Sequence, residues 1–212
     1  MVKYTHIIWD WNGTLLNDVS ASLASVNDML AMRGKPLIDI DFYKECICVP
    51  IIGFYEKTFD MEKEDYSVII KQYNEGYLRH LEDCSLTDGV EEVIDFFNKN
   101  GVKQAVISSS NNAQLVQNAT KYGIFDRFDA VLGADDFYAG SKIERAEKYL
   151  SGSRNEARIL VVGDIQHDAD MAEKLGADCV LLTSGHENKE RLAAAKATVI
   201  SDVRELIALS QE

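Results

Sequence analysis

Short apolar runs alternate with amphipathic stretches along most of the chain. Runs rich in β-branched residues and bounded by turn formers predict buried strands at residues 6–9, 104–107, 130–132, 159–162, 179–182 and 198–200. The clearest helix is expected to begin at an Asp88 N-cap and to bury a face of Val90, Val93, Ile94 and Phe97. Further helices are expected at 168–175 and 188–196. Strands that alternate with helices predict an α/β fold with a doubly wound parallel sheet.

The segment from residue 17 to residue 86 breaks this alternation. Helical spacing recurs near residues 23–30, 54–59 and 66–81, and no convincing strand interrupts it. We therefore expect an all-helical cap at 17–86, inserted into a core made of residues 1–16 and 87–212.

The composition of the chain limits the classes of partner that we expect it to bind. The formal net charge of −13 disfavours binding to nucleic acid or anionic lipid, although a locally positive pocket for a small anion remains compatible with it. The four cysteines form no C-x-x-C pair, and no apolar run approaches membrane-spanning length. We expect a cytoplasmic protein without a membrane partner; its oligomeric state is left open.

The first candidate for chemistry is Asp10, which ends the first strand and precedes a turn at Asn12 and Gly13. A carboxylate placed there can attack phosphorus, and the backbone N–H groups that follow, at Trp11 and Asn12, can hold phosphate oxygens. An Asx-type turn after an edge strand is the alternative. We expect Trp9 to be buried in the core and Trp11 to be turned toward the cap.

Two later positions could bind phosphate. Ser108 and Ser109 follow a strand and are expected to open a helix, whose N-terminus favours anions; plain N-capping is the alternative. Lys142 stands at an expected helix start, where a cation opposes the helix dipole. Such a conflict is typical of functional positions, although a solvated surface lysine would look the same.

The most specific element is the stretch from Gly163 to Asp168. An apolar strand, a glycine and two carboxylates four residues apart, Asp164 and Asp168, precede a helix. Carboxylate ligands suit Mg²⁺. A loop aspartate followed by an N-cap aspartate is the alternative.

In this order, the four elements resemble the motifs of the haloacid dehalogenase superfamily, from Asp10 to Asp168. The position of the cap and the stretch at 183–188 resemble its helical-cap, phosphoglycolate-phosphatase-like members. The resemblance implies that Asp10 forms an aspartyl-phosphate on a small phosphorylated metabolite. It also implies that Ser108, Ser109 and Lys142 bind the phosphoryl group. Mg²⁺ would be held by the residues Asp10, Asn12 (through its carbonyl), Asp164 and Asp168.

Asn12 departs from the family pattern. Phosphatases of this family carry an aspartate there, as general acid and base, and an amide cannot exchange that proton. Acid–base assistance is typically worth about 10²–10⁴-fold in rate, so slow turnover is expected. Three explanations are open: a substrate with a good leaving group, a proton supplied by His167 or a cap residue, or an asparagine introduced in place of a natural aspartate.

Two other functions remain as alternatives. A protein that binds phosphorylated ligands with little turnover would tolerate Asn12. Phosphonate cleavage in this family uses a cap lysine; the cap loop at 48–53 has none, and Lys44 and Lys57 only flank it. By resemblance, Val49 and Pro50 of this loop face the active site. The spacing of His186 indicates no metal site.

Overall fold

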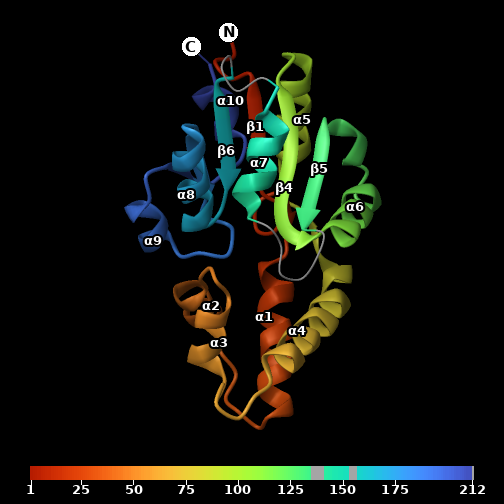
Figure 1. The fold of residues 1–212 in the computed structure, drawn as a ribbon, viewed down its shortest axis with the longest axis vertical. Helices are drawn as coiled ribbons and strands as arrows, with labels where there is room; N and C mark the ends of the chain where they lie inside the picture. Colours follow the sequence, from red (N-terminus) through yellow and green to blue (C-terminus); the bar gives the residue numbers. More distant parts are fainter. Residues whose placement is uncertain (135–140, 153–156, 212) are drawn as a thin grey trace.

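The centre of the molecule is a parallel sheet with strand order β5-β4-β1-β6-β7-β8 (Figure 1). The computed structural model describes residues 1–134, 141–152 and 157–211. The strands are β1 His6–Trp9, β4 Lys103–Asn111, β5 Ala130–Ala134, β6 Ile159–Gly163, β7 Asp178–Leu182 and β8 Thr198–Ile200. β1 lies in the middle, paired with β4 and β6, so residues that follow these three strands meet at one edge. The expected doubly wound α/β fold is confirmed.

Side chains of each strand alternate between two hydrophobic clusters, one on each face of the sheet. In β1, Ile7 and Trp9 belong to one cluster and Ile8 to the other. The first face is covered by α5 Val90–Lys99, α6 Asn112–Lys121 and α10 Glu205–Leu209, and the second by α7 Lys142–Leu150, α8 Gln166–Leu175 and α9 Lys189–Ala194. Because both faces are buried, the central residues of these strands are apolar, such as Ala105 to Ile107 in β4.

A helical cap with its own core lies beyond the carboxyl ends of the strands (Figure 1). It consists of α1 Val19–Met32, α2 Ile40–Cys46, α3 Ile52–Thr58, α4 Tyr66–His80 and the 3₁₀ turn η1 Leu81–Asp83. Phe54 and Tyr55 are fully buried in a third hydrophobic cluster inside the cap, as packing residues. The helix α2 was not expected from the sequence.

A short antiparallel ribbon joins the cap to the core. β2 Leu16–Asn17 pairs with β3 Ser85–Leu86, and Leu16 lies opposite Leu86. These two strands were missed, because two residues are too few to give an alternating pattern. The ribbon places both chain crossings side by side, next to the Asp10 loop.

Two further local expectations were wrong. Asp88 does not cap α5; Gly89, with φ +83°, occupies that position, a backbone conformation that glycine adopts at no steric cost. Ser108 and Ser109 do not open a helix: they lie within β4, which continues to Asn111, and α6 begins only at Asn112, with the Asn111 side chain as its cap. A shift of register in the ladder with β5 accompanies this extension. A second 3₁₀ turn, η2 Phe125–Arg127, precedes β5.

No helix in the described part of the chain combines the length and the apolar character needed to cross a membrane. The amino- and carboxyl-terminal segments meet at the end of the molecule opposite the cap, where Val2 bridges to Gln211 (Figure 1).

Candidate functional site

Three buried carboxylates converge where β1 and β6 end. Asp10 directly follows β1, Asp164 directly follows β6, and Asp168 lies in the first turn of α8. Each offers an oxygen within 4.8 Å of the others, and at most 8% of any of these residues is exposed. Three of the four residues expected from the sequence to hold a metal, all but Asn12, therefore lie in one group.

Lys142 supplies the positive charge at the centre of this group. It is the first residue of α7, and its Nζ donates to Asp10 Oδ1 at 2.6 Å and to Asp168 Oδ1 at 2.5 Å. Only 5% of the residue is exposed, which rules out a solvated surface lysine. Ser141 caps α7, because its hydroxyl accepts a hydrogen bond from the Glu144 N–H.

Burial and crowding perturb the ionisation of these groups. Burial raises the pKa of Asp10 to about 6, although the Lys142 ammonium acts against it. Burial also raises the pKa of Asp164 to about 8; His186 lowers it, and the charges of Asp10 and Asp168 raise it further. The raised pKa values show that Lys142 and His186 together do not offset the negative charge of this group when all its carboxylates are ionised. A bound cation would relieve that repulsion.

The backbone is shaped to approach these carboxylates closely. A Cβ added at Gly13, where φ is +70°, would lie 2.2 Å from Asp164 Oδ2, and one added at Gly163 would lie 2.1 Å from Asp168 Oδ2. Thr14 Oγ1 donates to Asp164 Oδ1 at 3.0 Å, while the Asp164 N–H donates to Asp168 Oδ2 at 3.1 Å. Fixed carboxylate oxygens of this kind fit Mg²⁺, which prefers oxygen ligands in a rigid geometry.

Asp168 has a second task at the start of α8. Its Oδ2 accepts from the N–H groups of Asp164 and Ile165, as an acidic residue does in a capping box. Asp168 is therefore not the N-cap that the sequence offered as an alternative: Ile165 occupies that position, and Asp168 supports the cap from the first turn. Its other oxygen faces Lys142, so Asp168 also belongs to the carboxylate group.

The two serines expected to bind phosphate differ in burial. Ser108 is buried, and its Oγ accepts from the Ser110 N–H at 3.1 Å, whereas Ser109 is exposed.

Trp9 is fully buried, as expected. Trp11 is not turned toward the cap: it packs in the same hydrophobic cluster as Trp9, next to Tyr122, because the turn at Gly13 comes only after the side chain of residue 11 has entered the core.

The cap loop lies over the start of α8. Val49 is 56% exposed and lines a cleft of about 130 Å³ with His167, Arg191 and others, whereas Pro50 is exposed and does not line it.

Lys44, on α2, lies close to the core. Its Nζ is 3.4 Å from the Thr183 carbonyl oxygen. Burial lowers the pKa of Lys44, although Asp164 acts to raise it. A wider hollow of about 550 Å³ lies at the amino ends of β7 and β8, remote from the carboxylates.

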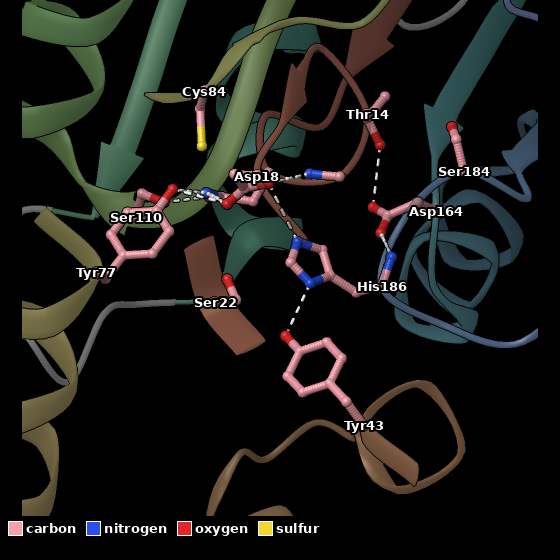
Figure 2. A network of polar contacts seen from close by, with 12 residues as sticks. Thr14, Asp18, Ser22, Tyr43, Tyr77, Cys84, Ser110, Asp164, Ser184 and His186 are labelled. Carbon is pink, nitrogen blue, oxygen red and sulfur yellow. Dashed lines mark hydrogen bonds and ion pairs between the residues drawn. The ribbon is translucent and has the colours of Figure 1, made fainter. Parts of the chain in front are cut away.

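A polar network around Asp18 was not foreseen from the sequence. Figure 2 shows Tyr43 reaching from the cap to His186, with Tyr77 beside Asp18. The His186 ring lies 2.8 Å from Tyr43 Oη and 3.2 Å from Asp18 Oδ1, and its backbone N–H donates to Asp164 Oδ2 at 2.7 Å. Burial alone would lower the pKa of His186, but the Asp18 carboxylate raises it to about 9. The contacts depend on how the cap sits on the core, which residue spacing does not encode.

An aspartate after the first strand, an acidic pair after a neighbouring strand and a helical cap are together typical of one class of α/β hydrolases. The sequence profile of the haloacid dehalogenase-like hydrolases matches residues 7–182, so the chain belongs to that family. The resemblance inferred from the motifs, and the expectation of a hydrolase of this family, are confirmed.

Individual relatives are distant. The tyrosine-protein kinase PtkA of Mycobacterium tuberculosis is 25% identical over 92% of this chain and 67% of its own length. A phosphoglycolate phosphatase of Pseudomonas fluorescens is 24% identical over 95% of this chain and 78% of its own. A haloacid dehalogenase-like hydrolase structure from Streptococcus pneumoniae has a TM-score of 0.83 at 17% identity, covering 98% of this chain and 99% of that one, which shows the shared fold.

Proposed function

We propose that the protein is a Mg²⁺-dependent phosphatase that hydrolyses a small phosphate monoester through an aspartyl-phosphate at Asp10. The observation that carries this proposal is the convergence of three buried carboxylates and the Lys142 ammonium at the carboxyl end of the sheet. Phosphoryl transfer depends mainly on positioning and charge neutralisation, which such a group of residues provides.

Asp10 is the nucleophile. One of its carboxylate oxygens forms a bond to phosphorus while the bond from phosphorus to the ester oxygen breaks, and the leaving alkoxide takes a proton from water. Water then attacks phosphorus while the bond from phosphorus to the Asp10 oxygen breaks, which releases phosphate and restores the carboxylate. The proton lost by this water neutralises the hydroxide left by the first step. Lys142 holds Asp10 at 2.6 Å and neutralises the phosphoryl charge, while Ser108, Ser109 and the N–H groups of Trp11 and Asn12 bind phosphoryl oxygens.

Mg²⁺ would be held by the carboxylates of Asp10 and Asp164 and by the backbone carbonyl of Asn12, with Asp168 in support. When bound, it neutralises negative charge on the transferring group. The residues themselves keep the site rigid: Thr14 and the His186 N–H fix both oxygens of Asp164.

Asn12 determines which leaving groups allow fast hydrolysis. Its amide neither gives a proton to the leaving oxygen nor takes one from the attacking water. Loss of acid–base assistance typically costs about 10²–10⁴-fold, so activated esters should react much faster than alkyl phosphates. The same feature is what favours a phosphate-binding protein with little turnover as the alternative.

The cap restricts the site to small substrates. Residues 17–86 form this cap, and residues 1–16 and 87–212 form the core. A small phosphorylated metabolite is consistent with the name of the Pseudomonas fluorescens relative, phosphoglycolate phosphatase. Free cysteines at 46, 48, 84 and 179 fit a reducing, cytoplasmic setting.

Lys44 favours a second candidate, cleavage of a phosphonate. Its ammonium reaches the core loop at Thr183, and burial lowers its pKa, as a lysine that forms a Schiff base with a carbonyl substrate requires. Borohydride trapping of Lys44 with a 2-oxoalkyl phosphonate would support this candidate, and the absence of an adduct would remove it.

The test of the phosphatase is hydrolysis of an aryl phosphate with and without Mg²⁺, in the parent protein, in Asp10→Asn and in Asp126→Asn. Asp126 is exposed on η2 and serves as the matched control. We expect metal-dependent turnover in the parent and the control and none in Asp10→Asn. Equal turnover in all three would refute the role of Asp10. Binding of phosphate without turnover in any of them would favour the binding protein.

A further inference from the structure

Asp18 is a buried carboxylate that the proposed mechanism does not use. It is 0% exposed at the start of α1, beside the ribbon between cap and core. Its Oδ1 accepts from the Gly13 N–H at 2.7 Å and faces the His186 ring at 3.2 Å, and its Oδ2 accepts from the Tyr77 hydroxyl at 2.7 Å. Gly13 lies in the loop after β1, His186 in the loop after β7 and Tyr77 in α4, so Asp18 ties the Asp10 loop to the core and the cap.

The remaining donor to Asp18 is the side chain of Asn12. Asn12 Nδ2 donates to Asp18 Oδ2 at 2.7 Å and to Tyr77 Oη at 2.8 Å, while Asn12 Oδ1 accepts from the Ser110 hydroxyl at 2.6 Å. The orientation of the amide is thereby fixed, because a reversed amide would place an oxygen against the Asp18 carboxylate. Asn12 meets a partner that only a hydrogen-bond donor can satisfy.

A carboxylate at position 12 would be incompatible with this arrangement. Two acceptor oxygens would lie about as close as the present 2.7 Å contact, with one of the two groups fully buried. Like charges at such a distance oppose each other strongly, and one group must take up a proton or move away. The asparagine at position 12 is therefore matched to the aspartate at position 18.

We infer that Asn12 and Asp18 form a reciprocal pair, in which Asp18 is the positioning residue that requires an amide at position 12. The inference is based on which atoms donate and accept around Asn12 and Asp18 and on the distance between the two groups. The effect that we expect on turnover rests on the proposed phosphatase function. Position 12 accepts a carboxylate only when position 18 offers a donor.

Exchanging the two groups satisfies each partner again. With asparagine at position 18, its Oδ1 accepts from the Gly13 N–H and the His186 ring, and its Nδ2 donates to the new carboxylate at position 12. That carboxylate also accepts from Ser110 and Tyr77. The total charge is unchanged, whereas Asn12→Asp alone adds one negative charge and Asp18→Asn alone removes one.

The experiment compares the parent with Asn12→Asp, Asp18→Asn and the double variant Asn12→Asp/Asp18→Asn. Asn17→Asp is the matched control, because it adds the same charge at an exposed neighbouring position. Two quantities are measured: the urea midpoint of unfolding in EDTA, and the ratio of kcat on an alkyl phosphate to kcat on an aryl phosphate. The ratio reports proton transfer to the leaving group, which a general loss of structure does not change.

We expect both single variants to unfold at lower urea than the parent and the double variant to recover most of the loss. The ratio of rates should rise by at least about tenfold in the double variant, within the range of acid–base assistance, and stay low in Asn12→Asp. If Asn12→Asp alone is as stable as the parent and has the raised ratio, the pairing is refuted. Recovery of stability with no turnover in any protein upholds the pairing and refutes the phosphatase instead.

Discussion

Replacing Lys142 by methionine tests how much the central ammonium stabilises the site. Methionine keeps most of the apolar stem of lysine, so the change removes the charge and leaves little empty volume. In the parent, Nζ lies 2.6 Å from Asp10 and 2.5 Å from Asp168. Because a cation at a helix start opposes the dipole of α7, its stability must come from these two carboxylates.

The expected loss in the free energy of unfolding comes from the two buried carboxylates, Asp10 and Asp168, that remain without their ammonium partner. Removing one partner of a buried ion pair costs roughly 3–5 kcal/mol, since the other charge stays buried without compensation. Here both carboxylates are at least nine-tenths buried, and the pKa of Asp10, already about 6, should rise further. Mg²⁺ should restore part of the lost stability, because it supplies positive charge to the same carboxylates. Turnover should fall by about 10²–10³-fold, the usual effect of losing one electrostatic stabiliser.

Urea unfolding followed by circular dichroism, with EDTA and with Mg²⁺, measures this loss. Lys148→Met is the matched control, on the same helix but exposed, and should change stability by less than about 0.5 kcal/mol. A loss in Lys142→Met no larger than that of the control would refute the assignment of Lys142 as the neutralising charge.

Three further outcomes are expected. The Asp18 carboxylate raises the pKa of His186 to about 9 despite burial; the stability that the imidazolium adds is therefore complete below pH 6.5 and is lost as pH rises through 9. In EDTA, the excess stability of the parent over His186→Gln should fall across that window, and an excess that does not change with pH would contradict the ion pair. Lys44→Met should raise KM several-fold, equivalent to at most about 1 kcal/mol for a partly exposed charge, with kcat nearly unchanged in steady-state assays; a large fall in kcat would assign Lys44 to the chemistry. Trp9→Phe leaves the buried Gln104 Oε1 without its 3.0 Å donor and should cost roughly 1–3 kcal/mol in urea unfolding; a neutral change would mean that Gln104 finds another partner.

The sequence predicts the sheet and the charged centre of the site for the same reason. Apolar runs with parallel connections place strand ends at one edge, so Asp10 and Asp164 had to come close once β1 and β6 paired. The face of α5, from Val90 to Phe97, is buried as its helical spacing predicts. These features depend on local pattern and on sheet topology, which residue spacing encodes.

The cap contacts could not be predicted in this way. Asp18, Tyr77 and His186 meet because the cap docks at one angle on the core, and their separations in the sequence carry no sign of it. The burial of Lys142 was equally hidden, since a lysine at a helix start is exposed in most settings. Asn12 illustrates the difference: its lack of a proton-exchanging group is visible in the sequence, but its pairing with Asp18 is visible only in the structure.

The most direct test of the account is to trap the covalent intermediate. The protein is mixed with Mg²⁺ and an aryl phosphate, quenched in acid during turnover, digested and mapped by mass spectrometry. We predict one added phosphoryl group on the peptide that contains Asp10, accumulating because Asn12 gives no help to the attacking water, and none in Asp10→Asn. Turnover with the phosphoryl group on another residue, or without any adduct at any quench time, would contradict the central role of Asp10.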